Sequence, residues 1–211
     1  FIIFQGFLYA FDCNTGQPLW PIEERAVPKS DVPGEEAWPT QPHPTLPLPF
    51  DRQGLGEDDL IDLTPALKAA ALEAVKGWRL TELYTPPSIQ GAADGTRGIL
   101  RLPHALGGGN WEAGAYDPDT GMLYIGSMTQ VQATSLSPAP PGSEIAYQFA
   151  GGQTPSVMGL PLVKPPWGRI PAVDLNKGEI LWQVAHGETP DAVKNHPALK
   201  GVSIPRTGRP G

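Results

Sequence analysis

An eleven-residue pattern occurs twice in this chain, and it constrains the fold more than any other feature. Residues 10–20 read AFDCNTGQPLW and residues 172–182 read AVDLNKGEILW, so the copies share Ala, Asp, Asn, Gly, Leu and Trp. A weaker third copy, AYDPDTGMLYI at residues 115–125, keeps Ala, Asp and Gly but has Ile125 in place of Trp. One Asp-to-Gly segment could arise by chance, whereas two matched copies predict a fold built from repeated units.

Each copy predicts a β-hairpin, in which an apolar strand leads into Asp-x-x-x-Gly and a second apolar strand follows. Asp and Asn side chains accept hydrogen bonds from nearby backbone N–H groups, and Gly supplies the positive φ that such a turn needs. The spacing fits a G1-type bulge or a slightly longer turn. On the return strands, Trp20 and Trp182 are large enough to fill the gap between neighbouring sheets.

Proline and glycine restrict the rest of the chain. The 211 residues include 26 Pro and 25 Gly, which argues against long helices, while a hydrophobic content of 40% argues against wholesale disorder. Eight prolines lie between residues 21 and 54. We expect no regular strand or helix there, but an extended and partly polyproline-like loop.

A helix is predicted after this loop. Thr64 suits the N-cap, Pro65 suits the first helical position and Gly77 marks the end. One face of the helix would be apolar and comprise Leu67, Ala70, Ala71, Ala74, Val75 and Trp78.

Three further segments have recognisable patterns. Residues 98–103 alternate like a short strand, and residues 133–143 are rich in Ser, Ala and Pro, which is typical of an exposed loop. Thr189 followed by Pro190 predicts a second N-cap and a short helix that stops before Pro197.

Charge and cysteine content limit the function. A net charge of -7 argues against nucleic acid as a partner, because phosphate binding needs clustered Lys and Arg. The single Cys13 excludes an internal disulfide or a multi-cysteine zinc site within these residues. Since the sequence starts with Phe1 inside a predicted strand and ends on a Gly- and Pro-rich run, we interpret it as part of a longer polypeptide.

Few residues suggest chemistry on their own. The four histidines have no metal-binding spacing, and we interpret them as surface or loop residues. Glu57, Asp58, Asp59 and Asp62 lack the calcium-loop pattern, so a solvated approach to the helix is favoured.

The pair Asn110-Trp111 is the strongest candidate site. It follows Gly107-Gly108-Gly109, where bare backbone allows close approach of a ligand, and the amide and the indole offer hydrogen bonding and stacking. The triple glycine lacks the Lys and the helix of a phosphate-binding loop. A turn-forming Asn beside a buried structural Trp is the alternative that the residues alone leave open.

The repeated pattern resembles the tryptophan-docking repeat of dehydrogenases that depend on pyrroloquinoline quinone (PQQ). Longer segments resemble the glucose-dehydrogenase-like branch of that family, namely residues 20–50, ELYTPPS at 82–88, GGGNWEAGAYDPDTGMLYIGS at 107–127, and residues 164–191 and 195–211. The resemblance covers essentially the whole chain, and the loop segments are more specific than the repeat.

The resemblance implies an all-β fold, a partial eight-bladed β-propeller of the quinoprotein type. Residues 1–211 would be one stretch of a single propeller domain, with residues 21–100 as a long insertion that carries the short helix. It also implies oxidation of an alcohol or a glucose-like aldose in the periplasm by PQQ, with calcium and an Asp base. Electrons would pass to a quinone or a cytochrome.

The resemblance carries only the cofactor-binding role of Asn110, with Trp111 beside it, onto this chain. The catalytic Asp and the calcium ligands would lie outside residues 1–211, as would any segment that associates with a membrane, so we expect these residues alone to be inactive. The chain departs from the family pattern at Phe4, where a cofactor-contacting Lys is common, and at Cys13, where Arg is usual. The alternative is a non-catalytic propeller scaffold with the same repeat.

Overall fold

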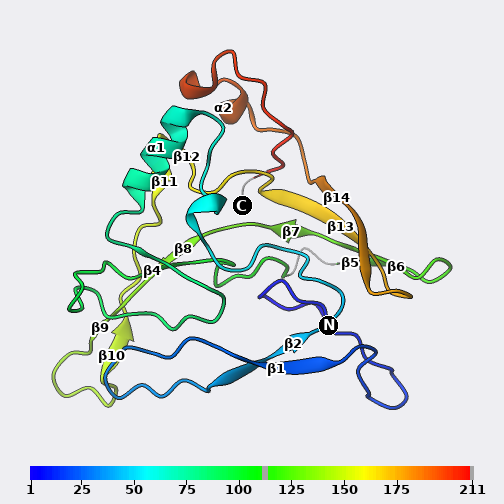
Figure 1. Ribbon diagram of the computed structural model, residues 1–211, viewed down its shortest axis with the longest axis horizontal. Coiled ribbons are helices and arrows are strands. Elements are labelled where there is room, and N and C mark those ends of the chain that lie inside the picture. The colour runs from blue at the N-terminus through cyan, green and yellow to red at the C-terminus, as the bar shows by residue number, and fades with distance from the viewer. Residues whose placement is uncertain (111–113, 210–211) are drawn as a thin grey trace.

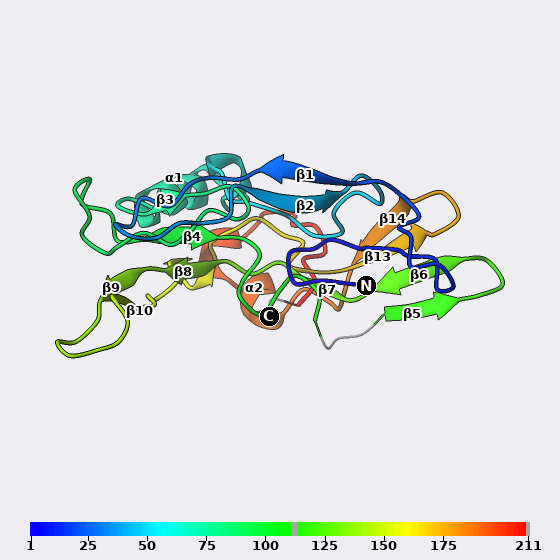
Figure 2. The same cartoon turned by 90° about the horizontal axis from the view of Figure 1, so that it is seen from below.

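The computed structural model describes residues 1–110 and 114–209. Short strands and irregular connections dominate these residues, and the few helices are short, which fits the predicted all-β class. Figure 1 shows a sheet of long hairpins on one side of the molecule and helix α1 on the other. Figure 2 shows from below that the molecule is flattened, with the ribbon β1–β2 along one surface.

The second and third copies of the repeat form one antiparallel sheet, called the hairpin sheet below. Its main strands run in the order β14-β13-β6-β5, and a short strand pairs with the other half of β13. The strands are β5 (Gly114–Asp117), β6 (Met122–Ile125), β7 (Ser127–Met128), β13 (Gly168–Asp174) and β14 (Glu179–Ala185).

All three copies share one turn geometry, which confirms the predicted chemistry. Gly16, Gly121 and Gly178 have φ of 72°, 75° and 73°. In each turn the glycine N–H donates to the backbone carbonyl of the Asp four residues earlier, over 2.8–2.9 Å. Each Asp side chain also accepts from the backbone N–H two residues later. The first copy nevertheless forms only an isolated bridge, between Phe11 and Pro18, instead of a strand pair.

Turns of different copies pack against one another. The side-chain amide of Asn176 donates to the carbonyl of Thr120 over 3.0 Å, and Leu175 N donates to the carbonyl of Gly121 over 2.9 Å. A Cβ added at Gly178 would lie 2.8 Å from the Trp20 ring, so the Trp of the first copy rests on the turn of the second. Contact between copies therefore fixes where the hairpins sit.

The proline-rich segment contains regular strands, so the prediction of none was wrong. β1 (Ile22–Ala26) and β2 (Thr40–Pro44) form an antiparallel ribbon of two strands. Proline is tolerated here because a two-stranded ribbon leaves one side of each strand unpaired, where a missing N–H costs nothing. Arg25 also pairs with Glu23 within β1, at 2.9 Å.

The predicted helix is confirmed as α1 (Pro65–Ala74). The Thr64 hydroxyl accepts from Leu67 N over 3.1 Å, and Gly77 adopts a φ of 76° beyond the helix. The predicted apolar face packs into the larger buried cluster, which also includes Leu60, Ile61, Leu100, Leu162 and Trp167. A 3-10 helix, η1 (Glu57–Asp59), leads toward α1 and places the acidic residues on the surface.

Smaller sheets complete the strand content. They are formed by β3 (Arg79–Leu80), β4 (Ile99–Arg101) and β8 (Gln132–Thr134); by β9 (Leu136–Pro138) and β10 (Tyr147–Phe149); and by β11 (Ser156–Val157) and β12 (Leu160–Pro161). The strand predicted at 98–103 is confirmed as β4. Residues 133–143 are not simply an exposed loop, because β8 pairs with β4 and buries Thr134 and Ser135.

The last helical segment differs from its predicted cap. Helix α2 (Asp191–Lys194) is followed by a 3-10 helix, η2 (Pro197–Leu199). Thr189 does not cap α2, because its hydroxyl accepts from Thr207 N over 3.0 Å. Within residues 1–110 and 114–209, no helix has the length and apolar character that crossing a membrane requires.

Candidate active site

The segment from His104 to Asn110, called the glycine loop below, is held by backbone hydrogen bonds on two sides. Gly108 N donates to the carbonyl of Phe4 over 2.9 Å, and Met128 N donates to the carbonyl of Gly108 over 2.8 Å. The loop thus lies between the N-terminal segment and β7. Its last residue, Asn110, is half-buried, whereas Trp111 lies outside the described residues.

The three glycines pack too tightly for any side chain. A Cβ at Gly107 would lie 2.7 Å from Phe4, one at Gly108 would lie 2.6 Å from Asp51 Oδ2, and one at Gly109 would lie 2.9 Å from the Phe50 ring. Real Cβ atoms do not approach other atoms this closely. The three glycines are buried, and they are needed because the segments that pack against the loop leave no room for a side chain.

A buried carboxylate, Asp51, supports the loop from below. The side chain of Asp51 is 0% exposed and accepts from Ser127 Oγ over 2.5 Å and Thr129 Oγ1 over 2.6 Å. Its Oδ1 also accepts from Arg52 N over 2.7 Å and lies 3.3 Å from the Arg169 guanidinium. Such a complete set of partners is what makes burial of a carboxylate tolerable.

Two arginines extend this network to the next segment. Arg169 donates to the Thr129 hydroxyl, and Arg52 donates to the carbonyls of Lys164 and Pro165 over 2.7 and 3.1 Å. Burial lowers the pKa of the Arg169 guanidinium, and the charge of Asp51 opposes that shift. The network thereby joins the proline-rich connection, the strand β7 region and β13 behind the glycine loop.

Comparison with known proteins identifies the family. Residues 4–211 match the model of the PQQ family described as the glucose/ethanol/alcohol dehydrogenase β-propeller domain. The chain belongs to the PQQ-dependent dehydrogenases. The match confirms the resemblance found in the repeat and in the loop segments.

Several curated relatives are similar over most of the chain. The quinate/shikimate dehydrogenase (quinone) of Acinetobacter baylyi is 30% identical, with 88% of this chain and 25% of the relative covered. Quinoprotein glucose dehydrogenase A of Acinetobacter calcoaceticus is 28% identical, with 98% and 27% covered. The glycerol dehydrogenase large subunit of Gluconobacter thailandicus is 27% identical, with 85% and 27% covered. The chain thus spans about a quarter of the length of these quinoproteins.

The donor set of this PQQ-dehydrogenase chain fits one edge of a cofactor site. Asn110 stands at the end of a rigid loop, and its amide can both donate and accept hydrogen bonds. In the part of the chain that the structure describes, no group of three or more His, Cys, Asp or Glu could hold a metal.

A small cavity of about 140 Å³ opens beside the glycine loop. Its lining includes Phe4, Tyr84, Arg101 and His104. Phe4, where we expect a departure from the family pattern, is 47% exposed, lines this cavity and lies against Gly107. The other departure, Cys13, is an exposed free thiol in the first turn.

Two basic side chains, Arg101 and His104, line the cavity, and the sequence predicted a functional role for neither. Burial lowers the pKa of Arg101, and burial followed by the charge of Arg101 lowers the pKa of His104. Tyr84 has a φ of 66°, and burial, followed by the Tyr9 hydroxyl, raises its pKa to about 12.

The remaining histidines lie elsewhere. His43 on β2 contacts the rings of Phe7 and Tyr84, with centroids 5.2 and 5.6 Å away. His196 accepts from Ala198 N at the start of η2, and His186 is exposed. The four are thus dispersed, and only His104 belongs to the glycine loop.

Sequence reasoning missed Asp51 and Arg101. No spacing links Asp51 to Ser127 or Thr129, which follow 76 and 78 residues later. Arg101 lies in residues 98–103, which the sequence predicted only as a short strand. The one available indication was a charged residue inside an otherwise apolar segment, as in LPF-Asp51 and GIL-Arg101.

Proposed function

We propose that the protein oxidises an alcohol or an aldose hydroxyl with bound PQQ and passes the electrons to a quinone or a cytochrome. The match of residues 4–211 to the dehydrogenase propeller domain carries the proposal. The relatives' names, which refer to quinate, glucose and glycerol, support a small polyhydroxylated substrate. When bound, PQQ would supply a quinone that accepts the equivalent of a hydride, that is two electrons and one proton, from the substrate.

In this proposal the described residues hold and orient the cofactor. Asn110 binds its edge through the side-chain amide, and Trp111 lies beside it in sequence. The glycine loop keeps Asn110 in place because its backbone is bonded on two sides and backed by the Asp51 network. A group held in advance in this way loses little entropy when the ligand binds.

We also propose that calcium assists as a Lewis acid, with its ligands and an Asp base outside the described residues. Residues 1–211 would be part of a single eight-bladed propeller domain with residues 21–100 inserted, in a periplasmic protein. The hairpin sheet and the matching turns of all three repeat copies support the propeller, whereas the periplasmic location rests on the family resemblance.

The proposal is tested on the complete gene product with a redox dye as the electron acceptor. We expect dye reduction with quinate, glucose or glycerol that requires both PQQ and calcium. No dye reduction by a folded complete protein would overturn the assigned activity, and absence of PQQ binding would favour the scaffold alternative. The 211 residues alone are expected to reduce no dye.

The role of Asn110 has its own test. Replacing it (Asn110→Ala) should weaken PQQ binding about fivefold or more, as the loss of one hydrogen bond predicts. Asn195→Ala, at an exposed helix end, is the matched control and should leave PQQ affinity unchanged. Equal PQQ affinities in both variants would remove Asn110 from the binding site.

A further inference from the structure

The small cavity beside the glycine loop has the size of a single functional group. Its volume of about 140 Å³ is less than half of the roughly 300–1,000 Å³ that sites for whole ligands occupy. It lies between the Tyr84–Thr85 turn, the end of β4 and His104. A ligand would therefore place one substituent in it while the rest of the ligand lies outside.

Arg101 is the feature that needs an explanation. Its Nε is fully buried without a hydrogen-bond partner, and the guanidinium forms no ion pair with the residues that the structure describes. Arg79 and Arg169 differ from Arg101 in having acidic partners, Asp31 and Asp94 for Arg79 and Asp51 for Arg169, although the Nε of Arg169 also lacks a hydrogen-bond partner. Burying a cation without a partner is costly, so Arg101 is suited to receive an anion.

His104 supplies a second donor at the same cavity. Its Nδ1 accepts from Leu106 N over 3.0 Å, which leaves the proton of the neutral ring on Nε2. Arg101 and His104 both line this cavity, and burial followed by the charge of Arg101 lowers the pKa of the ring. An anion between them would be attracted by the guanidinium and could accept a hydrogen bond from Nε2.

We propose that this cavity binds a carboxylate group through Arg101, with His104 as the second donor. The guanidinium fork matches the two oxygens of a carboxylate, and the walls at Phe4, Leu83 and Pro103 are apolar. Glu82 also lines the cavity, but its residue is exposed, so solvent screens its charge.

His104 belongs to the same glycine loop as Asn110, so we assign the carboxylate to a molecule bound at the proposed active site. Resting on the proposed function, the inference names a substrate class: polyhydroxylated carboxylic acids, in preference to uncharged sugars or polyols. PQQ itself carries carboxylates and is the other source of the same group. The experiment has to separate these two sources.

Calorimetry on the complete gene product tests binding without any turnover. The probe is cyclohexanecarboxylate, which has no hydroxyl to oxidise, titrated with and without PQQ. We expect Arg101→Gln to weaken its binding about 10- to 100-fold, as the loss of a charge-assisted contact predicts. Arg25→Gln, on exposed β1, is the matched control and should not change the affinity.

Kinetics then separates the sources of the carboxylate. If the site binds the carboxylate of the substrate, the probe should bind to the protein that already holds PQQ. Arg101→Gln should then raise the KM for quinate by a factor similar to its effect on probe affinity, and it should leave the KM for glycerol unchanged. If the site instead binds a carboxylate of PQQ, bound PQQ should prevent binding of the probe, and Arg101→Gln should weaken the binding of PQQ.

Unchanged probe affinity in Arg101→Gln, or no probe binding to the wild type, overturns the carboxylate site. If Arg101→Gln fails to fold, Arg101→Lys and His104→Gln carry the test, each with an expected partial loss of probe affinity. Should the complete protein reduce no dye, the proposed function fails, while probe binding that depends on Arg101 would still establish the carboxylate site.

Discussion

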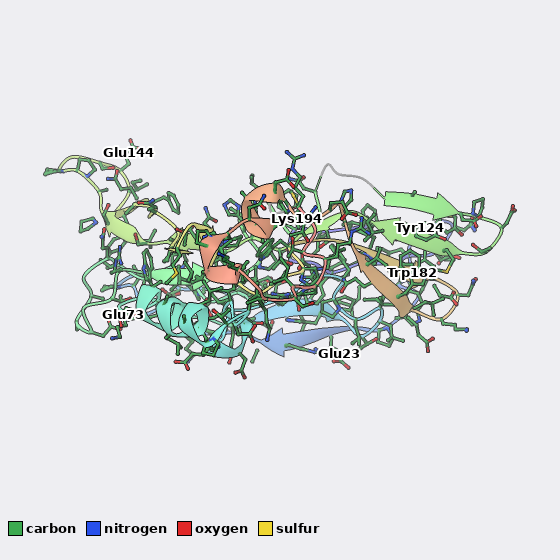
Figure 3. All side chains as sticks on the ribbon, turned by 90° about the horizontal axis from the view of Figure 1, so that it is seen from above. Glu23, Glu73, Tyr124, Glu144, Trp182 and Lys194 are labelled. Atoms are coloured by element: carbon green, nitrogen blue, oxygen red, sulfur yellow. The ribbon has the colours of Figure 1, made fainter. Side chains whose placement is uncertain are left out.

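The edge strand of the hairpin sheet and helix α1, which lies in the connection at residues 21–100, bury their apolar side chains to very different extents. On the edge strand β14, Leu181, Trp182 and Val184 are 50%, 45% and 48% exposed, whereas Leu67 on helix α1 is 0% exposed. Figure 3 shows Tyr124 and Trp182 together on the hairpin sheet and Glu73 of α1 toward the opposite end of the molecule. The ring centroids of Tyr124 and Trp182 are 5.8 Å apart.

This difference indicates that the repeated hairpins alone do not form the main hydrophobic core. The hairpin sheet shares a small buried cluster of Leu8, Phe50, Ile125 and Val173. The larger cluster is built by the connection and by the segments that pack on it. A repeated unit needs a neighbouring unit to cover its apolar face, whereas a capped amphipathic helix packs on the adjoining chain.

Asp51 joins the two regions, so its removal should have the largest effect. In Asp51→Ala the guanidinium of Arg169 and the hydroxyls of Ser127 and Thr129 lose a buried partner. We expect the free energy of unfolding to fall by about 3–5 kcal/mol, measured by urea unfolding. Asp191→Ala, whose side chain is 91% exposed, is the control. Equal unfolding midpoints in the two variants would show that the network does not hold the regions together.

The comparison between the regions is tested by one substitution in each. Leu67→Ala removes a fully buried side chain from the larger cluster and should cost about 2–5 kcal/mol. Leu181→Ala removes a half-exposed side chain and should change stability by less than about 0.5 kcal/mol. Similar losses in the urea unfolding of both variants would contradict the assignment of the core to the connection.

The packing beneath the glycine loop should tolerate no added atom. In Gly108→Ala the new Cβ would lie 2.6 Å from Asp51 Oδ2, so either the loop or the carboxylate must move. We expect a destabilisation of about 1–3 kcal/mol, again by urea unfolding. Gly56→Ala is the control, because its Cβ would lie 3.7 Å from the nearest atom. A stable Gly108→Ala with unchanged PQQ affinity would show that the loop is not tightly held.

The smallest effect concerns the turn of the third repeat copy. The Thr120 hydroxyl, followed by the backbone N–H of Asp119, lowers the pKa of Asp117 below its ordinary value of 3.8. Because the folded pKa lies below the unfolded value, this contribution to stability is present above the unfolded pKa and is lost as pH falls through the folded pKa.

Thr120→Val should raise the pKa of Asp117 toward 3.8, as followed by carbon-13 NMR of the carboxyl group. The pKa of Asp12, which the backbone N–H and then the side chain of Thr15 lower in another turn, should stay unchanged in this variant. An unaltered titration of Asp117 would show that the Thr120 hydrogen bond does not set its pKa.

The sequence predicted those elements whose cause is local. The turns at Gly16, Gly121 and Gly178, the capped helix after Thr64 and the strand at Ile99–Arg101 depend on neighbours within a few residues. The strands β1 and β2 were missed because their pairing partners lie on the far side of a loop, and pairing outweighed the proline content.

For the candidate site, the sequence proposed Asn110 and the glycines before it, and the role of Asn110 toward a cofactor stays a prediction. The triple glycine suggested bare backbone for a ligand, whereas the structure shows that Phe4, Asp51 and Phe50 also require it. The role of Arg101 could not be predicted, since a charge in a strand pattern does not reveal whether a carboxylate lies opposite it.

The sequence by itself determined the family, the repeated turns and the position of Asn110, because these depend on residue types at short, fixed spacings. The tertiary structure alone decided that Asp51 meets Ser127 and Thr129, and that Arg101 stands without an acidic partner beside His104. The first result arises from segments far apart in the chain that pack around the buried carboxylate of Asp51. The partner of a buried charge is set by the tertiary fold, and the sequence around the charge does not predict which residue that partner is.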